Sequence, residues 1–308
     1  MQTQNGSAIM VSGSDGTPTI KVRLASSLAL CLALILSSCA QENTTAADML
    51  ESATPDAPLR IAAAANLSDV LPHIVSAYTA DKGRSDRDIE ITFASSGKLY
   101  AQIKAGAPYD IFLSANQDFP AKWAKDRPAT TTQTQHAPFT YTQGQLAFYS
   151  ATREVGALNQ TTLAQLLATP SNRKIAIANP ELAPYGASAT AYLRSQNIYE
   201  SLTQQKRLIQ AENIGQAFQY ANTGHVDYGF VAQSQVTAAQ ATAEQFYTLA
   251  PESYPAILQD GIVLSDSVVA TDFTHYLLSP TGQRYFVDAG YLAVRAPKIA
   301  ETIAQTTQ

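Results

Sequence analysis

From Leu59 onward, short apolar runs alternate with segments in which apolar residues recur every three or four positions. The run at residues 59–63 predicts a buried strand, and the alternation at 89–93 predicts another. Between them lies one apolar face of an amphipathic helix, which we expect Asn66 to cap; the face consists of Leu67, Val70, Leu71, Ile74, Val75 and Tyr78.

The same alternation continues to the C-terminal region. We expect strands at 111–114, in two pieces around Gly144 within 139–149, and at 175–178, 207–210 and 228–231. We expect helices from about Ser96 to a stop at Gly106, and at 187–193, 214–220, 273–278 and 282–289. This order predicts an α/β fold with mixed, mainly parallel sheets flanked by helices.

The N-terminal part has the features of an export signal. Lys21 and Arg23 precede an apolar run at 24–36, and Ser37-Ser38-Cys39 follow. The run is shorter than the roughly 20 residues of a membrane span, and a basic, apolar, small-residue order is typical of a signal peptide. Residues 36–39 also resemble a bacterial lipobox, which implies cleavage after residue 38 and a lipid on Cys39; ordinary secretion is the alternative. Residues 39–58 have no apolar period and predict a flexible tether.

Composition excludes several classes of function. The 308-residue chain has a formal net charge of −5, whereas a nucleic-acid binder needs a basic face. Its two cysteines are Cys31 and Cys39, so the folded part has no disulfide or cysteine metal site. The four histidines lack metal spacing, and no nucleophile pairs with a base. We therefore expect neither an enzyme nor a cofactor.

Four predicted strand-to-helix junctions consist mainly of small or neutral residues. Each opens a helix, where backbone N–H groups lack intrahelical partners and the helix dipole is positive. Together they could bind an anion without charged side chains, although each alone is ordinarily just a cap or turn. The junctions are Ala64-Ala65-Asn66-Leu67, Ala94-Ser95-Ser96-Gly97, Ala183-Pro184-Tyr185-Gly186 and Glu212-Asn213-Ile214-Gly215.

These segments resemble the molybdate-binding proteins of ABC transporters. The most specific part is the serine-containing run at 93–99 with the following Gly-Ala-Pro-Tyr-Asp-Ile-Phe-Leu-Ser-Ala at 106–115. Residues 62–67, 177–186 and 228–231 resemble the same family. The resemblance implies a class II periplasmic binding protein fold, in which two α/β lobes are joined by a hinge with two chain crossings. Residues 59–141 and 249–308 would form one lobe, and 142–248 the other.

The family's ligand positions fall on four residues of this chain. The resemblance implies that Asn66, Ser96 and the backbone N–H groups of Tyr185 and Ile214 bind a tetrahedral oxyanion, molybdate or tungstate. A tyrosine that many members place after the Gly-Phe-Val strand is replaced here by Ala232. The only metal implied is the one inside that oxyanion.

The implied function is capture of the oxyanion outside the cytoplasm and delivery to an ABC permease. We expect a periplasmic or extracytoplasmic, lipid-anchored monomer that does not bind nucleic acid. A first alternative is a binding protein for sulfate, phosphate or an organic acid, the last of which would call for an arginine fork. A surface lipoprotein that acts through protein contacts is a second alternative, and a hydrolase is a third.

Overall fold

The computed structural model describes residues 58–126 and 136–294. The predicted signal peptide, Cys39 and nearly all of the tether lie outside these residues. Within them, no helix is both long enough and apolar enough to cross a membrane.

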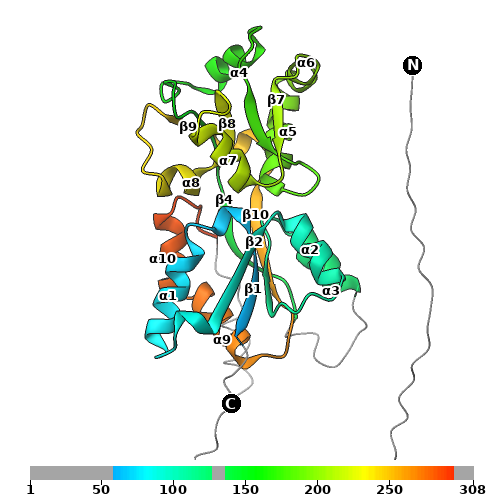
Figure 1. Ribbon diagram of the computed structural model, residues 1–308, viewed down its shortest axis with the longest axis vertical. Coiled ribbons are helices and arrows are strands. Elements are labelled where there is room, and N and C mark those ends of the chain that lie inside the picture. Colours follow the sequence, from blue (N-terminus) through cyan, green and yellow to red (C-terminus); the bar gives the residue numbers. More distant parts are fainter. Residues whose placement is uncertain (1–57, 127–135, 295–308) are drawn as a thin grey trace, which may run out of the picture. The chain divides into compact units, whose positions relative to one another are not determined.

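Ten strands and ten α-helices alternate along the described chain (Figure 1). The strands are β1 (Leu59–Ala64), β2 (Ile89–Ala94), β3 (Ile111–Leu113), β4 (Phe139–Gly144), β5 (Leu146–Tyr149), β6 (Ile175–Ala178), β7 (Leu208–Ala211), β8 (Tyr228–Ala232), β9 (Phe246–Thr248) and β10 (Ile257–Val263). The helices are α1 (Leu71–Asp81), α2 (Ser96–Lys104), α3 (Asp118–Asp126), α4 (Gln160–Ala168), α5 (Pro184–Ser195), α6 (Tyr199–Gln204), α7 (Ile214–Asn222), α8 (Gln233–Ala238), α9 (Val268–Leu278) and α10 (Pro280–Asp288). Short 3₁₀ turns are η1 (Ala65–Leu67), η2 (Asp86–Asp88) and η3 (Pro251–Ser253).

The strands form two five-stranded sheets, one in each lobe, with the orders β2-β1-β3-β10-β4 and β7-β6-β8-β5-β9. The chain therefore crosses between the lobes twice, once between β4 and β5 and once between β9 and β10. In each sheet two pairings are parallel and two are antiparallel. All of the antiparallel pairings involve β5 or β10, the first strand after each crossing. Each sheet therefore mixes parallel and antiparallel pairs because one of its strands enters directly from the other lobe.

In the first lobe, successive side chains along β1 point to opposite faces of the sheet, so the core has one part on each face. Ile61 and Ala63 pack in one cluster with Ile74 of α1 and Phe273 of α9, because every second side chain points to the same face. Ala62 packs in the cluster on the other face, with Leu99 and Ile103 of α2. Figure 1 shows α1, α9 and α10 on one side of this sheet and α2 and α3 on the other.

The second lobe has a single continuous core. Strands β5, β6 and β8 are buried along their whole length, as expected for central strands covered on both faces. Aromatic residues fill this core, and the ring centroids of Phe148 and Tyr228 are 5.0 Å apart.

The prediction that Asn66 caps the first α-helix is wrong. Residues 65–67 form η1 instead, and α1 begins only at Leu71 with Pro72 in its first turn. Proline has no N–H and a fixed φ, so it favours the start of a helix. The side chain of Asn66 is thereby released from capping and lies fully buried between the lobes.

Candidate functional site

The four junctions meet around one small cavity. Its wall combines the ends of β1 and η1 with the starts of α2, α5 and α7, so both lobes contribute. The lining residues are Ala64, Ala65, Asn66, Ser95, Ser96, Ala115, Ala183, Pro184, Tyr185, Asn213 and Ile214. The structure thus brings Asn66, Ser96, Tyr185 and Ile214 together.

Local sequence fixes where each of these helices begins. Pro184 occupies the first turn of α5, which places the N–H of Tyr185 among those with no intrahelical acceptor. Asn213 caps α7 by accepting a hydrogen bond from the backbone N–H of Gln216 at 3.0 Å, so Ile214 is the first helical residue. The N–H groups at these starts carry the positive end of the helix dipole.

Two buried side-chain oxygens of the cavity wall have no hydrogen-bond partner among the described residues: Asn66 Oδ1 and Ser95 Oγ. Both residues are at most 2% exposed. Ser96 Oγ accepts from the backbone N–H of Ala115 at 2.9 Å, which leaves its hydroxyl hydrogen available. Buried polar groups nearly always have partners, so unpartnered atoms around one cavity indicate a place for a polar ligand.

The cavity wall carries no charged side chain. The ion pair between Lys98 Nζ of α2 and Glu212 Oε1, just before α7, spans the two lobes at 2.6 Å. Both side chains are about half exposed, and exposed pairs contribute little. An anion in this cavity would therefore be bound by neutral donors.

Direct hydrogen bonds join the lobes beside the cavity. The backbone N–H of Gly97 donates to the carbonyl oxygen of Leu182 at 2.9 Å. Ser234 Oγ donates to the carbonyl oxygen of Asn66 at 3.3 Å. The start of α2 and η1 therefore both contact the second lobe beside the cavity.

A buried polar network lies behind the cavity. Gln259 of β10 is fully buried, and its Oε1 accepts from Asn66 Nδ2 and from the Tyr141 hydroxyl, both at 3.0 Å. Its Nε2 donates to the Tyr185 hydroxyl at 3.2 Å. Burial raises the pKa of Tyr141, Tyr185 and Tyr291 well above the usual value, so these hydroxyls stay protonated.

Sequence reasoning missed this network and the contribution of Ala115. Ser95 belonged to a predicted junction but was assigned no ligand contact. The strand β10 was not predicted, because Gln259 and Asp260 interrupt its apolar run. Ala232, which stands where many family members have a tyrosine, does not line the cavity. It precedes α8, and its N–H donates to Gln235 Oε1 at 3.0 Å.

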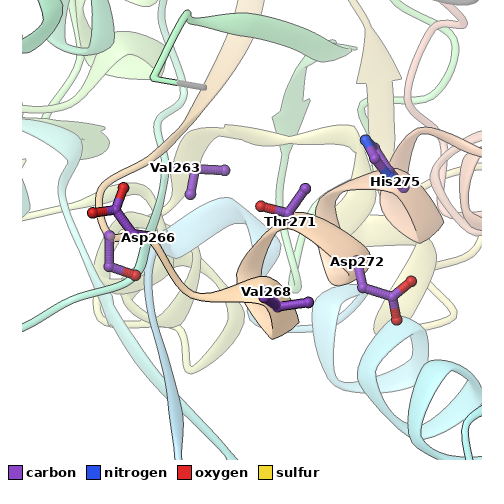
Figure 2. A pocket seen from close by; sticks show the side chains of 7 residues that line it. Val263, Asp266, Val268, Thr271, Asp272 and His275 are labelled. Atoms are coloured by element: carbon purple, nitrogen blue, oxygen red, sulfur yellow. The ribbon is translucent and has the colours of Figure 1, made fainter. Parts of the chain in front are cut away.

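A larger hollow lies at the start of α9 in the first lobe (Figure 2). Its lining comes entirely from residues 263–275, and the second sheet contributes nothing. Asp272 there already accepts from the Tyr78 hydroxyl and from Lys82 Nζ. With Asp266 beside it, the hollow is poorly suited to an anion.

The chain is similar in sequence to known solute-binding proteins. Residues 59–292 match the model of a family described as bacterial extracellular solute-binding protein. The chain is 30% identical over 238 residues to the molybdate-binding protein ModA of Rhodobacter capsulatus, covering 75% of this chain and 86% of that protein. It is 26% identical over 281 residues to YvgL of Bacillus subtilis, whose name describes an ABC transporter substrate-binding lipoprotein, covering 86% of this chain and 96% of that one.

A solved structure is similar over the same region. The periplasmic molybdate-binding protein of Azotobacter vinelandii superposes with a TM-score of 0.69 at 30% identity, and the match covers 77% of this chain and all of that one. The two-lobed architecture and the cavity therefore occur in a chain that resembles known solute-binding proteins along nearly the whole described region.

Proposed function

We propose, since this chain belongs to the family of bacterial extracellular solute-binding proteins, that it binds molybdate between its two lobes and delivers it to an ABC permease. The observation that carries the proposal is the convergence of helix starts, together with the unpartnered Ser95 hydroxyl, on one uncharged cavity. We assign the ligand contacts to the side chains of Asn66 and Ser96 and to the backbone N–H groups of Asn66, Ser96, Tyr185 and Ile214. Tungstate has the same charge and shape, and we propose it as a second ligand.

Neutral donors are sufficient for tight binding of a dianion. A hydrogen bond to a charged group contributes about 1.5–3 kcal/mol, so about six of them contribute on the order of 9–18 kcal/mol. Association costs at least ~4 kcal/mol. The difference, about 5–14 kcal/mol, corresponds to submillimolar to sub-nanomolar affinity without an arginine or lysine in the cavity.

Donors around the whole anion would also provide selectivity. An oxyanion that still carries a proton would place a donor against a donor, which disfavours hydrogen phosphate. Sulfate has the right charge but is smaller, and helix starts fixed on two sheets cannot all approach it. We therefore expect sulfate and phosphate to compete poorly with molybdate.

The family's description supports a location outside the cytoplasm. We propose in addition that Cys39 carries a lipid that anchors the protein, and that the chain acts as a monomer. For the lobes we propose residues 59–144 and 249–308 in one and 145–248 in the other, because β4 (Phe139–Gly144) pairs with β10 in the first sheet. The lipobox-like sequence and the similarity to the lipoprotein YvgL support the anchor.

Thermal denaturation with molybdate, tungstate, chromate, sulfate and phosphate tests the proposed ligand. A ligand that binds only the folded protein stabilises it by about 2.7 kcal/mol at a hundred times its Kd. We expect molybdate and tungstate to raise Tm strongly and sulfate and phosphate to raise it little. No shift with any oxyanion would overturn the proposal, and equal titration heats for sulfate and molybdate would overturn the selectivity.

Molybdate affinity is expected to be nearly constant between about pH 6 and 9, because no group in the cavity wall titrates there. Tyr185 is the one lining residue with an ionisable side chain, and burial raises the pKa of its hydroxyl. The pKa shifts of Tyr141 and Tyr291 behind it have the same sign and cause. Isothermal titration in buffers of matched ionic strength measures this; a steep change would reveal an ionisable ligand.

A further inference from the structure

The two ends of the Asn66 carboxamide have different surroundings. Its nitrogen faces the polar network around Gln259, and its oxygen does not. Asn66 Nδ2 donates to Gln259 Oε1 and to the Tyr291 hydroxyl, both at 3.0 Å. Asn66 Oδ1 has no partner among the described residues, although the residue is completely buried and lines the cavity. A carbonyl oxygen in this wall would repel an oxyanion.

A carboxamide exchanges its oxygen and nitrogen by a half-turn with little change in shape. Asn66 cannot turn alone, because its oxygen would then face Gln259 Oε1. If both amides turn together, Gln259 Nε2 donates to Asn66 Oδ1, and the Tyr185 hydroxyl changes from acceptor to donor toward Gln259 Oε1. The Tyr141 hydroxyl keeps its bond to the carbonyl oxygen of Ser114 at 2.9 Å and accepts from Gln259 Nε2.

The remaining partners of Asn66 also accommodate the reversal. Before the reversal, the Tyr291 hydroxyl donates to the backbone carbonyl of Asn66 at 2.7 Å, and Ser234 Oγ donates to the same carbonyl at 3.3 Å. After the reversal Tyr291 can donate to Asn66 Oδ1 while Ser234 keeps the carbonyl. Every group in the network then has a partner except Asn66 Nδ2, which faces the cavity as a donor and requires an acceptor there.

We propose that Gln259 is a positioning residue for the oxyanion site: it fixes the direction of the Asn66 carboxamide, and the two amides reverse together when the anion binds. This rests on the proposed function. Gln259 does not line the cavity, yet it contacts η1 and β4 of the first lobe and α5 of the second. It therefore links the chemistry of the cavity wall to the hinge strands.

The reversal also determines which anions fit. With Asn66 Oδ1 in the wall, the cavity presents an acceptor that repels an oxyanion. With Asn66 Nδ2 there, it presents only donors and suits a fully deprotonated one. Gln259 sets this choice because it can donate or accept toward Asn66 from the same position.

A double-mutant cycle on molybdate affinity tests the proposal. Gln259→Met keeps the length of the side chain but removes both hydrogen-bonding groups, and we expect it to weaken molybdate binding about tenfold. In an Asn66→Ala background the same change should have an effect of less than about twofold, because Gln259 acts through the Asn66 amide. Thr142→Val is the matched control, since Thr142 lies opposite Gln259 on β4 and its buried Oγ1 has no partner among the described residues; it should leave the affinity unchanged.

The outcomes separate this proposal from the proposed function. If the wild type binds molybdate and Gln259→Met has no effect, or an equal effect in both backgrounds, the positioning role is overturned and the function stands. If the wild type binds no oxyanion, both fail.

A second measurement tests the coupled reversal of the two amides even if the Gln259→Met variant does not fold. In wild-type protein, the side-chain amide proton signals of Gln259, assigned by triple-resonance spectra, should shift when molybdate is added, although Gln259 does not touch the cavity. Unchanged signals at saturating molybdate would overturn the coupled reversal.

Discussion

Replacing Asn66 by aspartate is expected to weaken molybdate binding at pH 8 by at least about a thousandfold, while leaving the side-chain shape nearly unchanged. The residue is fully buried in the cavity wall, so an ionised carboxylate there would face the dianion with little screening. Two unit charges about 4 Å apart interact by about 4 kcal/mol at an effective dielectric constant of 20, and a dianion doubles this. Isothermal titration with molybdate measures the loss.

The same variant should acquire a pH dependence that the wild type lacks. Burial raises the pKa of the new carboxyl, and the anion raises it further, so binding requires the protonated form. The protonated form dominates below the carboxyl's pKa; affinity should therefore recover as pH falls from 8 to 5, by up to about tenfold per unit.

Asn159→Asp is the matched control for this charge. Asn159 is exposed, caps α4 by accepting from the backbone N–H of Thr162, and lies outside the cavity wall. Aspartate is an equally good cap, so molybdate affinity and its flat pH profile should persist. If Asn66→Asp binds molybdate at pH 8 within tenfold of the wild type, the Asn66 side chain does not face the anion.

The strand-to-helix order and the helix starts around the cavity could be predicted from sequence because each depends on a few neighbouring residues. Pro184 and Asn213 fix the starts of α5 and α7, and such signals are local. Strand β10 could not be predicted in this way. Gln259 and Asp260 are tolerated in its buried middle only because residues distant in sequence, Asn66 and Thr140, supply hydrogen bonds.

The role of Asn66 shows the same limit within the site itself. Its position after a strand and before an apolar helical period is typical of a cap. Pro72 delays the helix, and the partners that engage the side chain instead, Gln259 and Tyr291, lie 193 and 225 residues away. The junction pattern and the family resemblance pointed to this residue, whereas its hydrogen-bond direction depends on tertiary packing.

Gly97 illustrates a site requirement that concerns space, not hydrogen bonding. It is the second residue of α2, and its N–H donates to the carbonyl oxygen of Leu182 in the other lobe. A Cβ at this position would lie 2.9 Å from Leu182 Cδ2, 3.0 Å from Leu182 Cα and 3.2 Å from Leu182 O. Two of these three atoms belong to the backbone, so a side-chain rotation cannot relieve the crowding.

Gly97→Ala is therefore expected to weaken molybdate binding by about 10- to 100-fold, because the lobes cannot approach closely enough for donors on both to reach the anion. Helix propensity acts in the opposite direction, since alanine is favoured over glycine by about 1 kcal/mol in a helix. Without anion, Tm should be unchanged or higher. A lower affinity with undiminished Tm is a combination that general destabilisation cannot produce; titration and calorimetry together measure it.

Gly215→Ala is the matched control, because Gly215 is the second residue of α7, the same position in its helix. A Cβ there would meet Ala65 Cβ of the other lobe at 3.8 Å, which is ordinary contact, and Asn213 Oδ1 of its own cap at 3.1 Å. We expect its affinity to stay within a few-fold of the wild type.

X-ray scattering should show a decrease in the radius of gyration on molybdate addition for the wild type and Gly215→Ala, and a smaller decrease for Gly97→Ala. Wild-type affinity in Gly97→Ala would mean that tight contact between Gly97 and Leu182 is not needed for binding.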